Sequence, residues 1–578
     1  MLVLSRLLPY LAQYKGRIAM GMLCLLLGKA ASVLEPQVLR MTVDDLTVAV
    51  TMRKLLYYSA LIVGLALIDG FFRFWMRRLL IGVSRYVEFD LRNDFYAHLQ
   101  RMSPSFFHRW RTGDLMSRAT NDIAAVRSVL GPGIMYPAET IIITIAALAF
   151  MLAINVELTL VALAVMPIVS VLVKKFGAVI HKRFETIQAK MSDLTAMAQE
   201  NLSGVRVVKA YTQEGAEEEK FEDANQDYFR HNLSLAKLWG AFYPLLAVFI
   251  GIGSALSLWW GGRLVVSQEI SLGQLVAFFA YLTMLTWPMI AFGWVVNIYQ
   301  RGAASLKRLA VIMDAEPDLT DALDVREDVE LRGCIEFRDV SFRYNGTDVL
   351  SGINLVIQSG ETLALVGRTG SGKSTLVSLV PRLYDVSAGQ VLVDGIDVRK
   401  LPLAKLREAV GFVSQDSFLF SETLRDNISF GRRDSSLDEI AKAAEVAGLA
   451  PDVADFPLGY DTMVGERGIT LSGGQKQRAT IARALLIEPP ILILDDALSS
   501  VDTETEDRIL TQLRGVIRNR TTLLVSHRIS TIKEADVIVV LEDGRIIEQG
   551  THETLVEQEG VYAELYRKQL LEEELERI

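Results

Sequence analysis

The chain has 578 residues, which is too long for one ordinary domain. Hydrophobic residues make up 51% of it and charged residues 22%, so a wholly soluble and a wholly membrane-embedded protein are both disfavoured, and a membrane half joined to a soluble half is expected. A net charge of −9 without a basic tail excludes a nucleic-acid partner, and the two cysteines, Cys24 and Cys334, give no disulfide or zinc pattern.

Residues 1–16 are amphipathic and basic, and a signal peptide is one reading of them. No small-residue cleavage site follows, and the next apolar stretch is full length. We therefore expect an elbow helix that lies on the membrane surface before a permanent span.

Residues 17–313 are expected to form an all-α membrane domain. About 20 apolar residues cross a hydrocarbon core as helix. Six stretches meet this length, at 18–39, 55–76, 133–154, 157–178, 240–261 and 273–297. Pro288 predicts a kink in the last of them, because proline disrupts the helix around it.

Basic residues gather in two segments of the membrane domain, between spans two and three and between spans four and five. They are Arg85, Arg92, Arg101, Arg109, Arg111, Arg118, Arg127, Lys174, Lys175, Lys182, Arg183, Arg206 and Lys209. Basic segments stay in the cytoplasm, so both termini are predicted to be cytoplasmic. Arg40, Arg53 and Lys54 on the outer side are exceptions. Both segments read as helical extensions of the spans.

An acidic linker is expected at 314–333, followed at 334–578 by an α/β domain in which short β-rich runs alternate with helical patterns. Within it, Gly367 to Thr375, "GRTGSGKST", matches G-x-x-x-x-G-K-[ST] between an apolar strand and a helix. This context predicts a loop whose N–H groups cradle phosphates, with Lys373 on the β- and γ-phosphates and Ser374 on Mg²⁺. The candidate residues are Gly367, Arg368, Thr369, Gly370, Ser371, Gly372, Lys373, Ser374 and Thr375.

The run "ILILDD" predicts a strand buried on both faces, with Asp495 at its end. Alone, such an acid is as compatible with an ordinary strand end. Beside a phosphate loop it is placed to hold Mg²⁺ through water.

The octet "LSGGQKQR", Leu471 to Arg478, opens another helix. With it the chain resembles an ATP-binding cassette (ABC) protein, and six spans followed by one cassette resemble an exporter half-transporter. The resemblance implies that the signature residues Leu471, Ser472, Gly473, Gly474 and Gln475 bind ATP held by the cassette of a second half-transporter subunit.

Further pieces resemble family elements. Tyr344 is similar to the residue that stacks on adenine, Gln415 to one that touches Mg²⁺, and His527 to one that contacts the γ-phosphate. The segments 464–468 and 499–502 resemble contacts between cassettes. Residues 105–118 and 200–214 are candidates for coupling helices that transmit force from a cassette to the membrane domain, or else are solvated helix-turns.

The family ordinarily carries a glutamate that activates water where this chain has Asp496. A base must reach attacking water within about 3 Å, and the aspartate is one carbon shorter. We expect ATP to bind well here and to be hydrolysed slowly, unless a small backbone shift compensates. An intact signature beside a short acid resembles the degenerate-site subunits of TmrAB-type bacterial heterodimers, with Asp496, His527 and Gln415 as the catalytic group.

The sequence names no substrate. Lys29, Glu35, Asp69 and Arg73 lie in the first two spans, where they are either functional or structural. Aromatic residues in and near the last span face either a cavity or packed helices: Phe278, Phe279, Tyr281, Trp287, Phe292 and Trp294. We expect export of hydrophobic or amphipathic drugs, lipids or peptides across a bacterial cytoplasmic membrane, in contact with its lipids. A homodimeric lipid flippase or peptide exporter and an ATP-gated, non-transporting regulator are the alternatives.

Overall fold

The computed structural model describes residues 4–576, apart from 165, 323–324, 327, 345, 466–467, 469, 499–502 and 518–519. The chain forms two compact units. The first comprises residues 1–99 and 112–315 and is helical; the second comprises residues 100–111 and 316–578 and is α/β. This order, helical first and α/β second, is the predicted one.

The helical unit begins with two short helices. Its elements are η1 (Leu4–Leu7), α1 (Leu8–Gln13), α2 (Lys15–Val48), α3 (Met52–Gln100, whose last residue belongs to the second unit), α5 (Thr112–Ser117), η2 (Arg118–Asp122), α6 (Ile123–Leu130), α7 (Pro132–Ile154), α8 (Val156–Ala164), α9 (Met166–Ser203), α10 (Val205–Ala210), α11 (Glu214–Val266), α12 (Leu272–Met284) and α13 (Thr286–Met313). Tyr10 and Tyr14 donate hydrogen bonds to Asp94 and Asp90 of α3, at 2.7 and 2.8 Å, and so fasten the N-terminal segment to that helix.

Five helical stretches of the described chain are long and apolar enough to cross a membrane, and each contains one predicted span. They are Lys15–Val48, Met52–Gln100, Thr112–Ile154, Glu214–Val266 and Leu272–Met313. The remaining predicted span, 157–178, falls on α8 and α9, with residue 165 between them outside the described residues. A kink is predicted at Pro288, and the helix is interrupted near it: α12 ends at Met284, four residues before the proline, and α13 begins at Thr286. In a regular helix the proline ring would clash with the carbonyl group four residues earlier.

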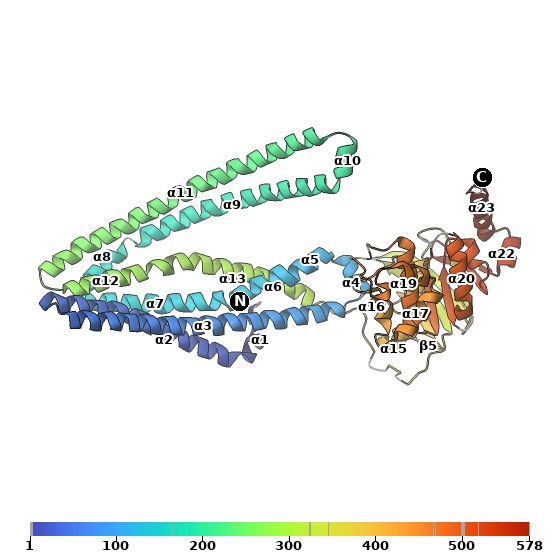
Figure 1. The fold of residues 1–578 in the computed structure, drawn as a ribbon, viewed down its shortest axis with the longest axis horizontal. Coiled ribbons are helices and arrows are strands. Elements are labelled where there is room, and N and C mark those ends of the chain that lie inside the picture. The colour runs from blue at the N-terminus through green and yellow to red at the C-terminus, as the bar shows by residue number, and fades with distance from the viewer. Residues whose placement is uncertain are drawn as a thin grey trace. The chain divides into compact units, whose positions relative to one another are not determined.

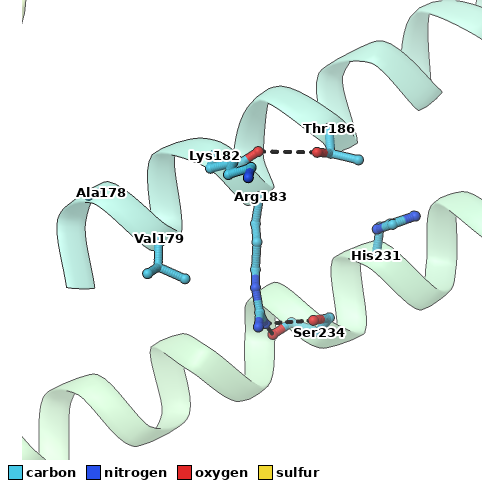
Figure 2. A pocket seen from close by; sticks show the side chains of 7 residues that line it. All are labelled: Ala178, Val179, Lys182, Arg183, Thr186, His231 and Ser234. Atoms are coloured by element: carbon cyan, nitrogen blue, oxygen red, sulfur yellow. Dashed lines mark hydrogen bonds between the residues drawn. The ribbon is translucent and has the colours of Figure 1, made fainter. Parts of the chain in front are cut away.

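Helices α9 and α11 run antiparallel, with the short α10 at the tip of the hairpin (Figure 1). Figure 2 shows Arg183 reaching from α9 to α11, where its Nη1 donates to the Ser234 carbonyl oxygen at 2.8 Å and to the Ser234 Oγ at 2.6 Å. A basic pocket of about 590 Å³ lies between the two helices.

Ionisable residues of the first two helices are paired. Lys29 is buried and its Nζ lies 2.6 Å from Glu139 of α7, so it does not snorkel to the membrane surface. Arg73 forms an ion pair with Asp69, one helical turn away. This pairing favours a structural role for the two residues over a functional one. Of the predicted aromatic set, Phe278 and Tyr281 are buried among helices, whereas Trp287 and Trp294 are exposed. The Phe292 side chain lies outside the described part.

The α/β unit contains two sheets. Its elements are α4 (Pro104–Arg109), β1 (Ile335–Tyr344), β2 (Thr347–Ile357), β3 (Thr362–Val366), α14 (Lys373–Ser378), β4 (Ala388–Val393), β5 (Ile396–Asp397), η3 (Val398–Lys400), α15 (Leu403–Glu408), β6 (Val410–Val413), α16 (Leu424–Ile428), η4 (Ser429–Gly431), α17 (Leu437–Val446), α18 (Ala450–Asp455), η5 (Gly459–Asp461), α19 (Gly473–Leu486), β7 (Ile491–Asp495), α20 (Thr503–Ile517), β8 (Thr521–Val525), α21 (Ile529–Ile532), β9 (Val537–Glu542), β10 (Arg545–Gly550), α22 (His552–Glu557) and α23 (Val561–Glu576). The smaller sheet has the order β2-β1-β4-β5 and the larger β10-β9-β3-β8-β7-β6.

The larger sheet is parallel from β9 to β6, and its central strands are buried on both faces. Along β7, Ile491 and Ile493 join one apolar core while Leu492 and Leu494 join the other. This two-residue alternation explains why the strand reads as a continuous hydrophobic run. Since parallel strands end at the same edge, the segments after β3, β6, β7 and β8 meet there.

Burial of β7 on both faces predicts a matched pair of stability effects. Ile493→Ala removes a fully buried side chain and is expected to cost about 3 kcal/mol of unfolding free energy. Ile547→Ala on β10, where the side chain is 42% exposed, is the control and should cost less than about 1 kcal/mol. Thermal unfolding of the purified chain measures both, and equal losses would contradict the placement of β7.

Candidate nucleotide-binding site

The phosphate loop follows β3 and leads into α14, in the predicted strand–loop–helix order. Gly367, Gly370 and Gly372 have φ values of +149°, +86° and +101°, which side-chain-bearing residues rarely adopt. A Cβ on Gly367 would lie 2.2 Å from the Leu541 carbonyl oxygen, and one on Gly372 would lie 2.8 Å from Leu350. Glycine is therefore required at both positions for the loop to close.

Lys373 is buried inside this loop. Its Nζ donates to the carbonyl oxygens of Gly367 and Arg368, at 2.8 and 3.0 Å, and lies 3.5 Å from the Ser371 Oγ. Burial lowers the pKa of the Lys373 amine. The ammonium is thus held at the centre of a ring of backbone groups, where an anionic ligand would compensate its charge.

Asp495 ends β7 and faces the loop. Its Oδ1 accepts a hydrogen bond from the Ser374 Oγ at 3.0 Å. Burial raises the pKa of the Asp495 carboxyl, an effect opposed by this hydrogen bond. A hydroxyl and a carboxylate oxygen are therefore side by side at the mouth of the phosphate loop.

Asp496 has a left-handed backbone, with φ at +49°. Its N–H donates to the Val525 carbonyl oxygen at 2.9 Å, which fixes the turn that leaves β7. Aspartate is enriched in this conformation relative to longer side chains. The short acid therefore suits the backbone that holds it.

A pocket of about 230 Å³ brings most of the predicted residues together. Its lining comprises Val349, Thr369, Gly370, Gly372, Lys373, Ser374, Thr375, Gln415, Asp495, Asp496, Val525 and His527. Gly367, Arg368 and Ser371 belong to the same loop behind this lining. Gln415 follows β6 and His527 follows β8, so the shared strand edge explains the meeting of residues far apart in sequence.

The signature residues Leu471, Ser472, Gly473, Gly474 and Gln475 do not line this pocket. Ser472 is exposed and caps α19: its Oγ accepts from the Gln475 N–H, and the Gln475 side chain accepts from the Ser472 N–H. The start of the helix is therefore exposed, and the N–H groups that the cap does not use, those of Gly473 and Gly474, can face an anion. Residues 499–502, and residues 466–467 of the segment 464–468, lie outside the described residues.

Tyr344, the predicted adenine-stacking residue, is the last residue of β1 and is not part of the pocket lining. Its ring packs 4.7 Å from that of Phe342 and 5.4 Å from that of Tyr384. The ring of His108, on α4, lies 6.4 Å from the ring of Tyr344. One candidate coupling helix, α4, thus packs beside the position expected to recognise the base.

Further contacts anchor α4 in the α/β unit. Phe106 is buried, and the hydroxyls of Ser103 and Ser105 donate to Asp318 Oδ2 at 2.9 and 2.6 Å. The other candidate segment, 200–214, contains α10, on which Val207 is exposed.

Two residues that hold site residues or their neighbours in place were not predicted from the sequence. Asp452 accepts hydrogen bonds from Gln475 and Arg478, at 3.0 and 2.8 Å, and so steadies the signature helix from α18. Glu506 on α20 is buried and pairs with Arg528, which follows His527. No local pattern links partners more than twenty residues apart, so single-sequence reasoning has no signal for either.

Comparisons with known proteins agree with this fold and site. Residues 18–289 match the family model described as ABC transporter transmembrane region, and residues 350–499 match the one described as ABC transporter. The chain is 38% identical to the multidrug resistance-like ATP-binding protein MdlA of Escherichia coli over 98% of this chain and 95% of that protein. It is 36% identical to the ATP-dependent lipid A-core flippase of Syntrophus aciditrophicus over 99% and 95% of the two chains.

A solved structure of a bacterial Atm1-family ABC exporter with ATP bound is 30% identical and superposes with a TM-score of 0.79, covering 96% of this chain and 99% of that one. The chain belongs to the ABC transporter family and is a multi-pass exporter half-transporter. Its cassette binds ATP and is an ATPase coupled to transport, and exporters of this family work as dimers.

Proposed function

We propose that this chain is the degenerate-site half of a heterodimeric exporter, in which its own nucleotide pocket turns over slowly and its signature serves a faster site on a different partner. The observation that carries the proposal is Asp496, which stands directly after Asp495 on the pocket wall where a glutamate is expected. It lacks one C–C bond of reach, about 1.5 Å. Misplacement of a catalytic group by about 1 Å can cost a factor of about 10² in rate.

The remaining pocket residues have binding roles in this proposal. Ser374, Asp495 and Gln415 offer hydroxyl, carboxylate and amide oxygens, which is the donor chemistry that Mg²⁺ prefers. Mg²⁺ would neutralise phosphate charge there. Lys373 and the loop N–H groups would bind the phosphates, His527 would contact the γ-phosphate, and Tyr344 would stack on adenine. We retain 1–16, 17–313, 314–333 and 334–578 as the proposed elbow, membrane domain, linker and cassette.

The exposed signature supports a division of labour between subunits. Ser472 and Gln475 form a complete helix cap, although they do not line the pocket of their own cassette. An exposed, capped helix N-terminus can bind the phosphates of a nucleotide that the cassette of another subunit holds. If the chain paired with itself, both sites would carry aspartate and turnover would be poor.

For the cargo, we propose hydrophobic or amphipathic molecules exported across a bacterial cytoplasmic membrane, with both termini and the cassette in the cytoplasm. The names of the relatives, one multidrug resistance-like and one a lipid A-core flippase, support this range without selecting within it. A homodimeric lipid flippase or peptide exporter remains the second candidate, because the lipid A-core flippase matches almost the whole chain.

Transport against a gradient tests the proposal. In vesicles that contain the chain with its partner, ATP should drive accumulation of an amphipathic fluorescent dye. An ATP-gated regulator built on the same scaffold would move nothing uphill, and that result would replace the exporter with the regulator.

Nucleotide affinity tests the assignment of the pocket. Lys373→Ala removes the ammonium at the centre of the loop and should weaken binding of a fluorescent ATP analogue at least tenfold. Lys400→Ala, which removes an exposed lysine of the same unit, should leave the affinity unchanged. Unaltered affinity in Lys373→Ala would place the nucleotide elsewhere.

A further inference from the structure

One face of α3 carries four arginines at helical spacing. Arg73, Arg77, Arg78 and Arg85 line an open groove of about 590 Å³ together with Gly70, Phe74, Ile81 and Gly82. Steps of three and four residues place all eight on one side of the helix. We call this feature the arginine groove. It belongs to the helical unit and shares no residue with the nucleotide pocket.

Phe74 and Ile81 make the arginine groove apolar between the guanidinium groups, and Gly70 and Gly82 leave bare backbone along it. A Cβ added at Gly70 or at Gly82 would meet nothing within 4 Å. Phe74, between them in sequence, is 58% exposed. The groove therefore offers apolar surface with guanidinium groups beside it, which matches an amphipathic anion in shape and chemistry.

Positive charge at the groove exceeds the charge of the acids that face it. Arg73 pairs with Asp69, and Glu35 of α2 lies within electrostatic range of both. Arg85 pairs with Glu88 at 3.0 Å, but Glu88 also serves Arg92 and Arg127, at 2.9 and 3.3 Å, so one carboxylate is shared by three guanidinium groups. The surplus charge is therefore positive.

The two arginines at the middle of the groove have no acidic partner in the part of the chain that the structure describes. Arg78 lies over the ring of Trp75, with its guanidinium carbon 5.4 Å from the ring centroid. Arg77 makes no ion pair or side-chain hydrogen bond with any described residue. The guanidinium N–H groups of Arg77 and Arg78 are therefore available to a ligand.

Position along α3 sets the depth of the groove. The helix begins at Met52 and rises about 1.5 Å per residue, so Arg77 to Arg85 lie about 38–50 Å from its start. A bilayer spans about 30 Å of hydrocarbon and about 40–45 Å with its headgroup layers. Arg77 and Arg78 therefore reach the far headgroup layer and Arg85 lies just beyond it, while Gly70 and Phe74 lie one to two turns deeper than Arg77, toward the acyl chains.

We propose that the arginine groove binds an acidic phospholipid, with the headgroup phosphate on Arg77 and Arg78 and an acyl chain along Phe74. A guanidinium pairs with a phosphate through two parallel hydrogen bonds, and a basic pocket at this depth recognises anionic headgroups in preference to zwitterionic ones. In the proposed topology the headgroup layer at this end of α3 is the cytoplasmic one, and that assignment alone rests on the proposed function. The lipid site itself does not depend on slow hydrolysis or on heterodimer formation.

Lipid binding to the purified, detergent-solubilised full chain without nucleotide is the test. The probes are phosphatidylglycerol and phosphatidylcholine with identical acyl chains, and native mass spectrometry gives both dissociation constants. We expect phosphatidylglycerol to bind at least tenfold more tightly than phosphatidylcholine. Its affinity should fall as the salt concentration is raised. Arg77→Gln/Arg78→Gln should raise its dissociation constant at least tenfold. Arg77→Gln alone, which breaks no described contact, should raise it severalfold in a chain that folds normally.

The matched control is Arg53→Gln, which removes an exposed arginine from the other end of the same helix and should change nothing. Equal affinity for both lipids would overturn the proposal, as would phosphatidylglycerol binding that survives the double substitution. Displacement of the lipid by millimolar inorganic phosphate would indicate a free-phosphate site instead. Loss of subunit association with unchanged lipid binding would assign the groove to a subunit interface. None of these outcomes depends on ATP turnover.

Discussion

Replacing Ser472 with arginine is expected to lower ATP turnover of the assembled exporter at least a hundredfold. Ser472 is the exposed cap of α19, and its small side chain leaves room for a phosphate to approach the N–H groups that the cap does not use. An arginine both removes the cap and fills the space into which a second cassette must close. Steady-state ATPase activity of the reconstituted pair measures the effect.

Ser436→Arg is the matched control for Ser472→Arg. Ser436 caps α17 through the same reciprocal arrangement with Glu439, is also exposed, and lies outside the signature. Both substitutions remove a helix cap worth about 1 kcal/mol, so they should destabilise the cassette alike. Only Ser472→Arg should stop turnover. Full activity of Ser472→Arg would show that this signature does not serve the fast site.

Asp496→Glu is expected to accelerate hydrolysis at this chain's own pocket at least tenfold. The added C–C bond moves the carboxylate about 1.5 Å further into the space shared with Gln415 and His527. Part of the gain is offset, because the longer side chain would occupy a left-handed backbone at a cost of about 1 kcal/mol. In the pair, the partner's fast site should first be silenced, so that the measured rate belongs to this pocket.

Asp496→Asn is the control for that experiment, since it keeps the length of the side chain and removes its charge. It should abolish the residual slow rate. An unchanged rate in Asp496→Glu would mean that side-chain length does not limit the pocket, and slow turnover would need another cause.

Most of the nucleotide-binding site can be predicted from sequence, because its residues lie in short continuous segments with characteristic patterns. The loop from Gly367 to Thr375 needs glycines at fixed steps and a lysine inside the turn, so a short pattern suffices to find it. Asp495 is likewise indicated by the apolar strand before it. Gln415 and His527 line the same pocket because the four parallel strands β3, β6, β7 and β8 end at one edge of the sheet.

Other features depend on distant partners or on backbone angles. Val349 and Val525 line the pocket only because β2 and β8 pass beside it. Aspartate is compatible with a left-handed turn, but the residue type alone does not predict the turn at Asp496. The hydrogen bond from Gln475 to Asp452 joins residues 23 positions apart. In the membrane unit, composition predicts apolar spans, but only packing shows that Lys29 is paired with Glu139 instead of reaching the membrane surface.

The rate at which this chain hydrolyses ATP without a different partner is the most direct test of the account. The purified chain, reconstituted alone in lipid vesicles, should bind ATP and turn it over only slowly, and Asp496→Glu should raise that rate at least tenfold. Rapid turnover by the unaltered chain, unchanged by Asp496→Glu, would contradict the claim that Asp496 makes this a slow site.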